Sequence, residues 1–173
     1  DLKAATVFLI GTAPVDTVHT NVIERADYIN KAHLIRSRKE AVQKFGEHAT
    51  GFTIPAAIDA IFDQAGPSGV GVIEVVNVYD PAVHTGGPGD VTNLHIIGGF
   101  STAGHPSGLQ LAYESYQKFG RFCKFIHAPG FTGMTGVRAE LDVICNRIRA
   151  RSILDAPIGA TRQDVIAARG SGG

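Results

Sequence analysis

Three glycines in the C-terminal third of the chain stand where a phosphate-binding loop could form. Gly130, Gly133 and Gly136 follow a short apolar run and precede an amphipathic pattern. Such glycines let a pyrophosphate approach a helix N-terminus, and Asp155, after the next apolar run, stands where a ribose-binding carboxylate would. The G-x-x-G-x-x-G spacing departs from the dinucleotide fingerprint G-x-G-x-x-G, and only 18 residues follow Asp155. We therefore interpret the glycines as a turn. A nucleotide-binding α/β enzyme using the turn from Gly130 to Gly136 is the alternative function.

Residues 99–104, with the sequence GFSTAG, nearly match the nucleophile elbow of hydrolases. That motif needs small residues on both sides of a strained serine. Here Ala103 replaces the second glycine. In that fold the catalytic histidine follows the acid, whereas no histidine lies beyond His127 in this chain. We therefore interpret Ser101 and Thr102 as ordinary turn or cap residues.

Histidines are the remaining candidates for chemistry. No two of them are four residues apart, as in a helical metal site, and no carboxylate-rich pattern accompanies them. We expect His95 and His127 to lie in strands, as core or rim residues. The seven are His19, His33, His48, His84, His95, His105 and His127. We therefore predict no catalytic, cofactor-binding or metal-ligating residue, no cofactor, and no enzymatic activity.

Charge and composition exclude several classes of partner. The 16 basic and 16 acidic residues cancel, which argues against a nucleic-acid binder because such proteins normally carry a basic stripe. No apolar run approaches the roughly 20 residues that cross a bilayer, so we expect no membrane insertion. The two cysteines fall on a strand and on the apolar face of a helix, where buried free thiols are expected. The basic run Arg147, Arg149 and Arg151 fits a solvated edge or, in an assembling protein, a contact with acidic residues of a neighbour.

The strongest structural signal lies in residues 121–157. An apolar run that ends at Pro129 predicts a strand buried on both faces, and a second short run at 152–154 predicts another. Between them, apolar residues recur on one face of a helix, namely Val137, Leu141, Ile144, Cys145 and Ile148. Two buried strands joined by an amphipathic helix make a parallel crossover unit. We therefore predict an α/β fold with an open mixed, mostly parallel sheet and helices on both faces.

The rest of the chain continues this alternation. We expect strands at residues 5–12, 71–79 and 94–97 and a short one at 31–35, with 71–79 as the central strand. Residues 15–30 and 80–90 are expected to be loops, and 66–69 a turn. Helices are expected after Ser37, which opens a capping box with Glu40, and after Thr53, Pro106 and Thr161. We expect one core unit at residues 1–169, a flexible Gly/Ser end at 170–173, and a chain that is a fragment of a longer one, since it begins at Asp1.

Short motifs, in order along the chain, resemble those of contractile tail sheath subunits, from bacteriophages and from their R-type pyocin relatives. Each motif is weak alone, but the series spans nearly the whole chain. The motifs are FLIGTAP at residues 8–14, HLIRS at 33–37 with FG at 45–46, AAIDAIFDQ at 56–64, FIHAPG at 125–130 and ILDAP at 153–157.

This resemblance implies a structural protein of the virion tail, phage or prophage, assembled in the cytoplasm of the bacterial host. Its partners would be further copies of itself in stacked hexameric rings, the tail tube protein, the baseplate and the tail terminator. Contraction of the sheath would drive the tube through the host envelope. Sheath subunits also have an N-terminal arm and a C-terminal domain that exchange strands with neighbours. We expect this chain to lack both.

Overall fold

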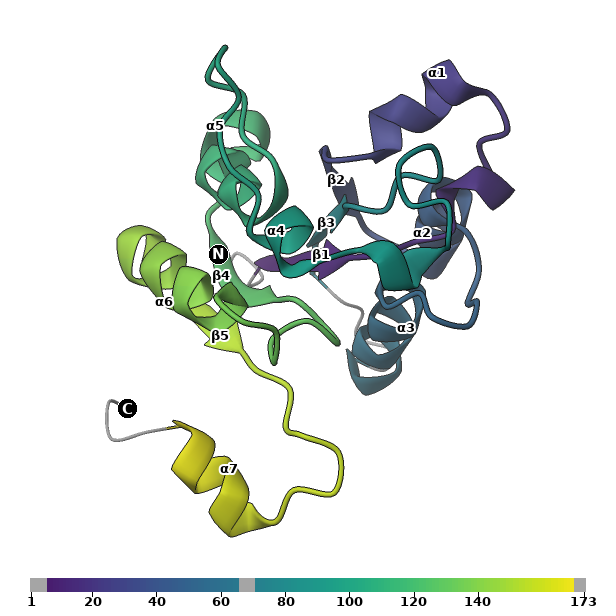
Figure 1. The fold of residues 1–173 in the computed structure, drawn as a ribbon. Coiled ribbons are helices and arrows are strands. Elements are labelled where there is room, and N and C mark those ends of the chain that lie inside the picture. Colours follow the sequence, from purple (N-terminus) through teal and green to yellow (C-terminus); the bar gives the residue numbers. More distant parts are fainter. Residues whose placement is uncertain (1–5, 66–70, 170–173) are drawn as a thin grey trace.

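The computed structural model describes residues 6–65 and 71–169, built around a five-stranded sheet with the strand order β2-β3-β1-β4-β5 (Figure 1). Strand β1 pairs in parallel with β3 and β4, and β4 with β5, while β2 runs antiparallel to β3. The predicted mixed, mostly parallel sheet is therefore confirmed. The strands are β1 (Thr6–Gly11), β2 (Ala32–Ile35), β3 (Ile73–Asn77), β4 (Cys123–His127) and β5 (Arg151–Ile153).

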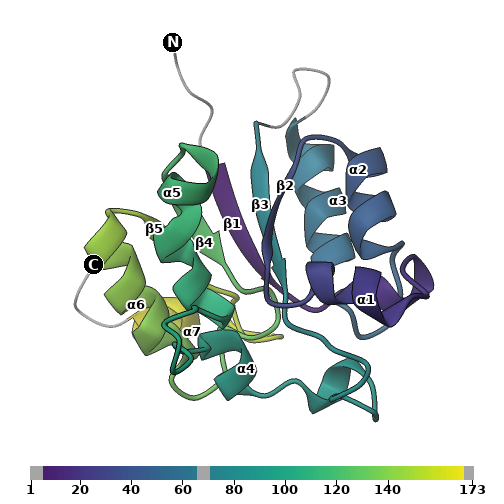
Figure 2. The ribbon, with the colours of Figure 1, turned by 90° about the horizontal axis from the view of Figure 1, so that it is seen from above.

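Helices lie on both faces of the sheet, as predicted. Figure 2 shows α2 and α3 on one side and α4, α5 and α6 on the other. The α-helices are α1 (Val22–Arg25), α2 (Arg38–Phe45), α3 (Ile54–Ala65), α4 (Asn93–Ile97), α5 (Ser115–Phe119), α6 (Val137–Ile148) and α7 (Arg162–Arg169). The short 3-10 helices are η1 (Val15–Thr17), η2 (Ala26–Tyr28), η4 (Pro88–Asp90) and η5 (Gly108–Glu114).

The sheet separates two hydrophobic clusters because alternate residues of a strand point to opposite faces. In β1, Leu9 joins the cluster under α2 and α3, whereas Phe8 and Ile10 join the cluster under α4, η5 and α6. Strand β3 is buried along its whole length and lies inside the sheet, although β1 occupies the middle position. The valine-rich run thus forms a buried interior strand, but the central position predicted for it belongs to β1.

Hydrogen bonds of Ser37 and Thr53 mark the starts of α2 and α3. Ser37 Oγ accepts a hydrogen bond from the Glu40 amide at 3.2 Å, as a capping residue should. The Glu40 carboxylate reaches the Arg36 amide at 2.8 Å, one residue before the expected partner. Thr53 precedes α3, and its hydroxyl accepts a hydrogen bond of 3.2 Å from the amide of Thr12. This bond ties the start of α3 to the end of β1.

The crossover unit is confirmed, with one correction. Helix α6 buries Val137, Leu141 and Ile144 completely, and β4 and β5 are parallel. The prediction that both strands are buried on both faces is wrong: in β4 Lys124 is exposed while Phe125 and His127 are only partly buried, and in β5 Ile153 is 44% exposed. Strand β5 is the edge of the sheet, and a three-residue apolar run carries no signal that distinguishes an edge from the interior.

The strand expected at residues 94–97 is wrong, since these residues form helix α4. The amide of Thr92, which precedes the helix, donates to Nδ1 of His95 at 3.0 Å. At the other end Gly98 adopts a φ of 66° and its amide donates to the Leu94 carbonyl, which stops the helix. A short apolar run is compatible with a strand or a helix, and here the capping contacts at Thr92 and Gly98 favour the helix.

Two further expectations need correction, and two others lie outside the described residues. Residues 15–30 contain η1, α1 and η2 rather than only a loop; each is too short to show a hydrophobic period. The helix expected after Pro106 begins as η5 and continues as α5. The predicted turn at 66–69 and the Gly/Ser end at 170–173 lie outside the described residues.

Candidate functional site

The turn that follows β4 is closed by a carboxylate of the chain itself. Asp155 Oδ2 accepts hydrogen bonds from the Gly130 amide at 2.8 Å and from the Thr132 hydroxyl at 2.9 Å. The Thr132 oxygen in turn accepts one from the Asp155 amide at 2.9 Å. Gly130 and Gly136 adopt φ values of 79° and 82°, so both serve the turn geometry. A pyrophosphate at this turn would have to displace Asp155 and would meet its negative charge.

Ser101 does not lie on a strand-to-helix elbow. It follows helix α4 and belongs to a narrow loop in which its amide donates to the His105 carbonyl at 2.9 Å and its hydroxyl accepts from the His105 amide at 3.1 Å. Gly98 and Gly108 form the base of this loop. A Cβ added at Gly98 would lie 1.9 Å from the Ser107 carbonyl oxygen, so the two backbones approach as only glycine allows. Ser101 therefore has the turn role predicted for it.

Two of the histidines are in direct contact with each other. His84 and His95 lie together: Nε2 of His84 is 3.3 Å from Nδ1 of His95, and His84 is 4% exposed. Burial, and next the neighbouring His84, lower the pKa of His95. His127 lies in β4 as predicted, whereas His95 lies in α4. This pair, eleven residues apart in sequence, was missed because the expected strand at 94–97 concealed it.

His19 and His33 serve packing beside α2. Both rings stack on Tyr28, with centroids 3.9 and 4.9 Å away. Their Nε2 atoms bond to the carbonyl oxygens of Lys44 and Asp27, respectively. His48 and His105 are exposed. Across residues 6–65 and 71–169, no group of three or more His, Cys, Asp or Glu side chains could hold a metal ion.

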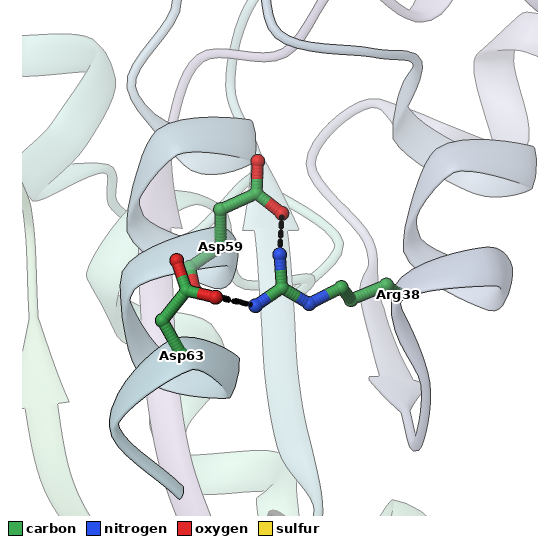
Figure 3. Close-up of polar contacts among 3 residues, drawn as sticks. All are labelled: Arg38, Asp59 and Asp63. Carbon is green, nitrogen blue, oxygen red and sulfur yellow. Dashed lines mark hydrogen bonds and ion pairs between the residues drawn. The ribbon is translucent and has the colours of Figure 1, made fainter. Parts of the chain in front are cut away.

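Arg38 joins α2 to α3 through ionic contacts with two carboxylates, as Figure 3 shows. Its Nη1 donates to Asp59 Oδ1 at 3.0 Å, and its Nη2 pairs with Asp63, one turn further along α3. The guanidinium also lies 5.8 Å from the Phe62 ring centroid. All three charged side chains are 44–69% exposed, so the contact is worth at most about 1 kcal/mol. The contact links α2 to α3, and the hollow beside it offers about 20 Å³, enough for about one water.

Glu74 is a buried carboxyl group that the sequence analysis did not single out. It lies in β3, is 1% exposed, and accepts a hydrogen bond from the Ser115 hydroxyl at 3.0 Å. Burial raises the pKa of Glu74 to about 7. Burial, and secondarily Glu74, raise the pKa of Cys123 to about 11, so this free thiol is not activated as a nucleophile. In the sequence, Glu74 is a charged residue within a valine-rich run that predicts a strand, and this unusual position was the signal that could have identified it.

The basic run lies where α6 ends and β5 begins. The Arg147 guanidinium is 5.0 Å from the Tyr113 ring centroid, Arg149 adopts a φ of 57° after the helix, and Arg151 opens β5. All three are exposed. In the described part of the chain, no helix is long and apolar enough to cross a bilayer.

Two curated proteins are similar to this chain, whereas no family model matches it. The tail sheath protein of Burkholderia phage BcepMu is 27% identical over 246 residues, which include 99% of this chain and 48% of the phage protein. A protein of Pseudomonas aeruginosa strain UCBPP-PA14, named as a prophage major tail sheath protein, is 29% identical over 159 residues, which include 91% of this chain and 38% of that protein.

The chain covers only part of each of these two relatives. The chain spans about half the length of the phage relative and less of the prophage relative. The alignment with the phage protein exceeds the 173 residues of this chain, so that protein carries stretches that have no counterpart here. The match nevertheless runs over nearly the whole α/β unit. The chain is therefore a relative of phage and prophage tail sheath proteins.

Proposed function

We propose that this chain is a structural, non-enzymatic subunit of a contractile phage-type tail sheath, with residues 1–169 as its α/β body. Copies of the chain polymerise around the inner tail tube, and contraction of the assembly drives the tube through the host envelope. The observation that carries the proposal is the alignment of 99% of the chain with a protein named as a tail sheath protein. The chain's partners are then copies of itself, the tube protein, the baseplate and the tail terminator, within the virion tail.

The fold supports a mechanical role. Contraction requires bodies that move as units while the contacts between them change. Here two hydrophobic clusters hold helices to both faces of one sheet, and Arg38 and Asp155 connect segments that lie far apart in sequence. Such a body transmits force without internal rearrangement because close-packed interiors deform little.

Deleting the coding sequence from the phage or prophage genome that carries it tests this function. Electron microscopy of the particles should then show tubes without a sheath, and expression of the full-length protein from a plasmid should restore the sheath. Particles that keep a normal sheath after the deletion would refute the proposal.

A further inference from the structure

In the part of the chain that the structure describes, one half of a sheet face has no helix over it. Two cross-strand rows lie on the face under α2 and α3: Val7, Phe125 and Arg151 form one, and Leu9, His127 and Ile153 the other. Leu9 is fully buried, His127 is partly exposed, and Ile153 is 44% exposed. Helix cover therefore ends between β1 and β4. We call the surface of Phe125, His127, Arg151 and Ile153 the open half-face.

The open half-face is apolar with a basic border. Phe125 and Ile153 supply an aromatic ring and a branched aliphatic side chain, while Arg151 places an exposed cation beside them. On the opposite face, Ala150 and Leu154 pack against the cluster under α6, so it is this face that attaches β5 to the core. A sheet surface of this kind normally packs against another element.

The opposite end of the molecule carries a surface of complementary character. Helix α1, just before β2, exposes Val22 and Ile23, at 69% and 81%, and the carboxylate Glu24 is exposed beside them. Strands β2 and β5 are the two edges of the sheet, and Figure 1 shows α1 and β5 on opposite sides of the molecule. One end of the chain thus presents exposed apolar side chains beside the Glu24 carboxylate, with the neighbouring Arg25 guanidinium bound to the His19 and Thr20 carbonyls. The other end presents an apolar surface beside an exposed cation.

We propose that α1 of one copy docks on the open half-face of the next copy, with Ile23 against Phe125 and Ile153, and Glu24 against Arg151. The inference rests on the proposed function, because it specifies how the copies associate. The two surfaces differ, so the contact is heterologous: it joins copies head to tail and builds a ring or a helix rather than a closed dimer. Apolar burial drives the association, and the charge pair fixes its register.

Sedimentation velocity of the chain over a concentration series tests this contact. Ile23→Asp and Ile153→Asp should each raise the dissociation constant at least about tenfold. Glu24→Arg and Arg151→Glu should each weaken association about five- to tenfold, and the double variant should recover most of the loss because the pair is restored in reverse. Circular dichroism and thermal melting establish that each variant is folded.

Matched controls use apolar residues that are exposed elsewhere. Val143 on α6 is 56% exposed and Ile166 on α7 is 47% exposed, so Val143→Asp and Ile166→Asp present the same chemical change away from the proposed contact. Both should leave the dissociation constant within about twofold of the unsubstituted chain. Equal effects of all four aspartate variants, loss of association only in Ile166→Asp, or a chain that stays monomeric at about 1 mM would each overturn the contact.

The experiments distinguish a failure of the proposed contact from a failure of the proposed function. Association that is insensitive to α1 and β5, together with sheathless particles after the gene deletion, refutes the contact and leaves the sheath function standing. Sheathed particles after the deletion refute the function, whatever the sedimentation experiment gives.

Discussion

The hydroxyl of Ser115 in α5 donates a hydrogen bond of 3.0 Å to the Glu74 carboxylate in β3. The same oxygen lies 3.0 Å from the Ala112 carbonyl, and one hydroxyl proton serves only one acceptor at a time. A protonated Glu74 can instead donate to Ser115, which frees the Ser115 proton for Ala112. Burial favours the neutral carboxyl group and raises the pKa of Glu74 to about 7, although the Ser115 hydrogen bond by itself lowers that pKa.

Glu74 should make the free energy of unfolding depend on pH. Its pKa is about 7 in the folded chain against 4.5 for the unperturbed group, so the folded state binds the proton more tightly. The contribution of Glu74 to the free energy of unfolding is full below about pH 4.5. It declines by about 3 kcal/mol in all as the pH rises through 7. Glu74→Gln should remove this decline, and urea unfolding between pH 5 and 8 measures it.

A matched control separates Glu74 from the other titratable groups of the chain. Exposed Glu47→Gln should reproduce the pH dependence of the unsubstituted chain. The difference between the Glu74→Gln curve and the unsubstituted curve isolates the buried carboxyl group. Parallel curves for the two chains would show that Glu74 does not titrate as described.

Asp155→Ala should loosen the turn after β4. The substitution removes the acceptor of the Gly130 amide and the Thr132 hydroxyl, at a cost of about 1–3 kcal/mol in the free energy of unfolding. Hydrogen exchange at the Gly130 amide should accelerate. Asp142→Ala, at an exposed position of α6, is the control and should change stability by less than about 0.5 kcal/mol. Unchanged protection of Gly130 would contradict the assigned role of Asp155.

Leu141→Ala should destabilise the chain by about 2–5 kcal/mol, because it leaves a cavity where a fully buried side chain of α6 meets the sheet. Val143→Ala on the same helix removes a side chain that is 56% exposed and should cost less than about 1 kcal/mol. Denaturant unfolding of both variants makes the comparison. Similar losses for the two would mean that α6 presents a different face to the sheet.

His95 should titrate below the ordinary histidine range. Burial and the neighbouring His84 both disfavour its charged form, so the pKa of His95 is lowered. The contribution of neutral His95 to the free energy of unfolding is present above about pH 6.5. It is lost as the pH falls through the lowered pKa of His95. His84→Asn should move the pKa of His95 part of the way back, because burial is the larger cause. NMR titration of the His95 ring checks this, and an unchanged pKa in the variant would exclude coupling.

Much of the fold was predictable because its signals are local and repeated. The spacing of Val137, Leu141 and Ile144 fixed the buried face of α6, and the capping residue Ser37 marked the start of α2. Helix α4 was missed because Leu94, Ile96 and Ile97 are compatible with a strand, and the decisive contact is the Thr92 amide on His95. Local signals fail where an apolar run is too short to distinguish helical from strand spacing.

Long-range relationships were beyond the reach of sequence patterns. Nothing adjacent to Asp155 in sequence indicates that it binds Gly130, 25 residues earlier, rather than a ligand. Likewise, Glu74 among valines indicates an unusual position without indicating Ser115 as its partner, 41 residues later. The exposed edge at β5 depends on strand order, which follows from the packing of the whole chain.

Electron cryomicroscopy of the tail in its extended and contracted states tests the central claim most directly. The account predicts a sheath layer around the tube in which this five-stranded body repeats, with the same internal fold in both states and changed contacts between copies. A sheath layer that does not accommodate the body, or a body whose sheet is rearranged on contraction, would contradict it.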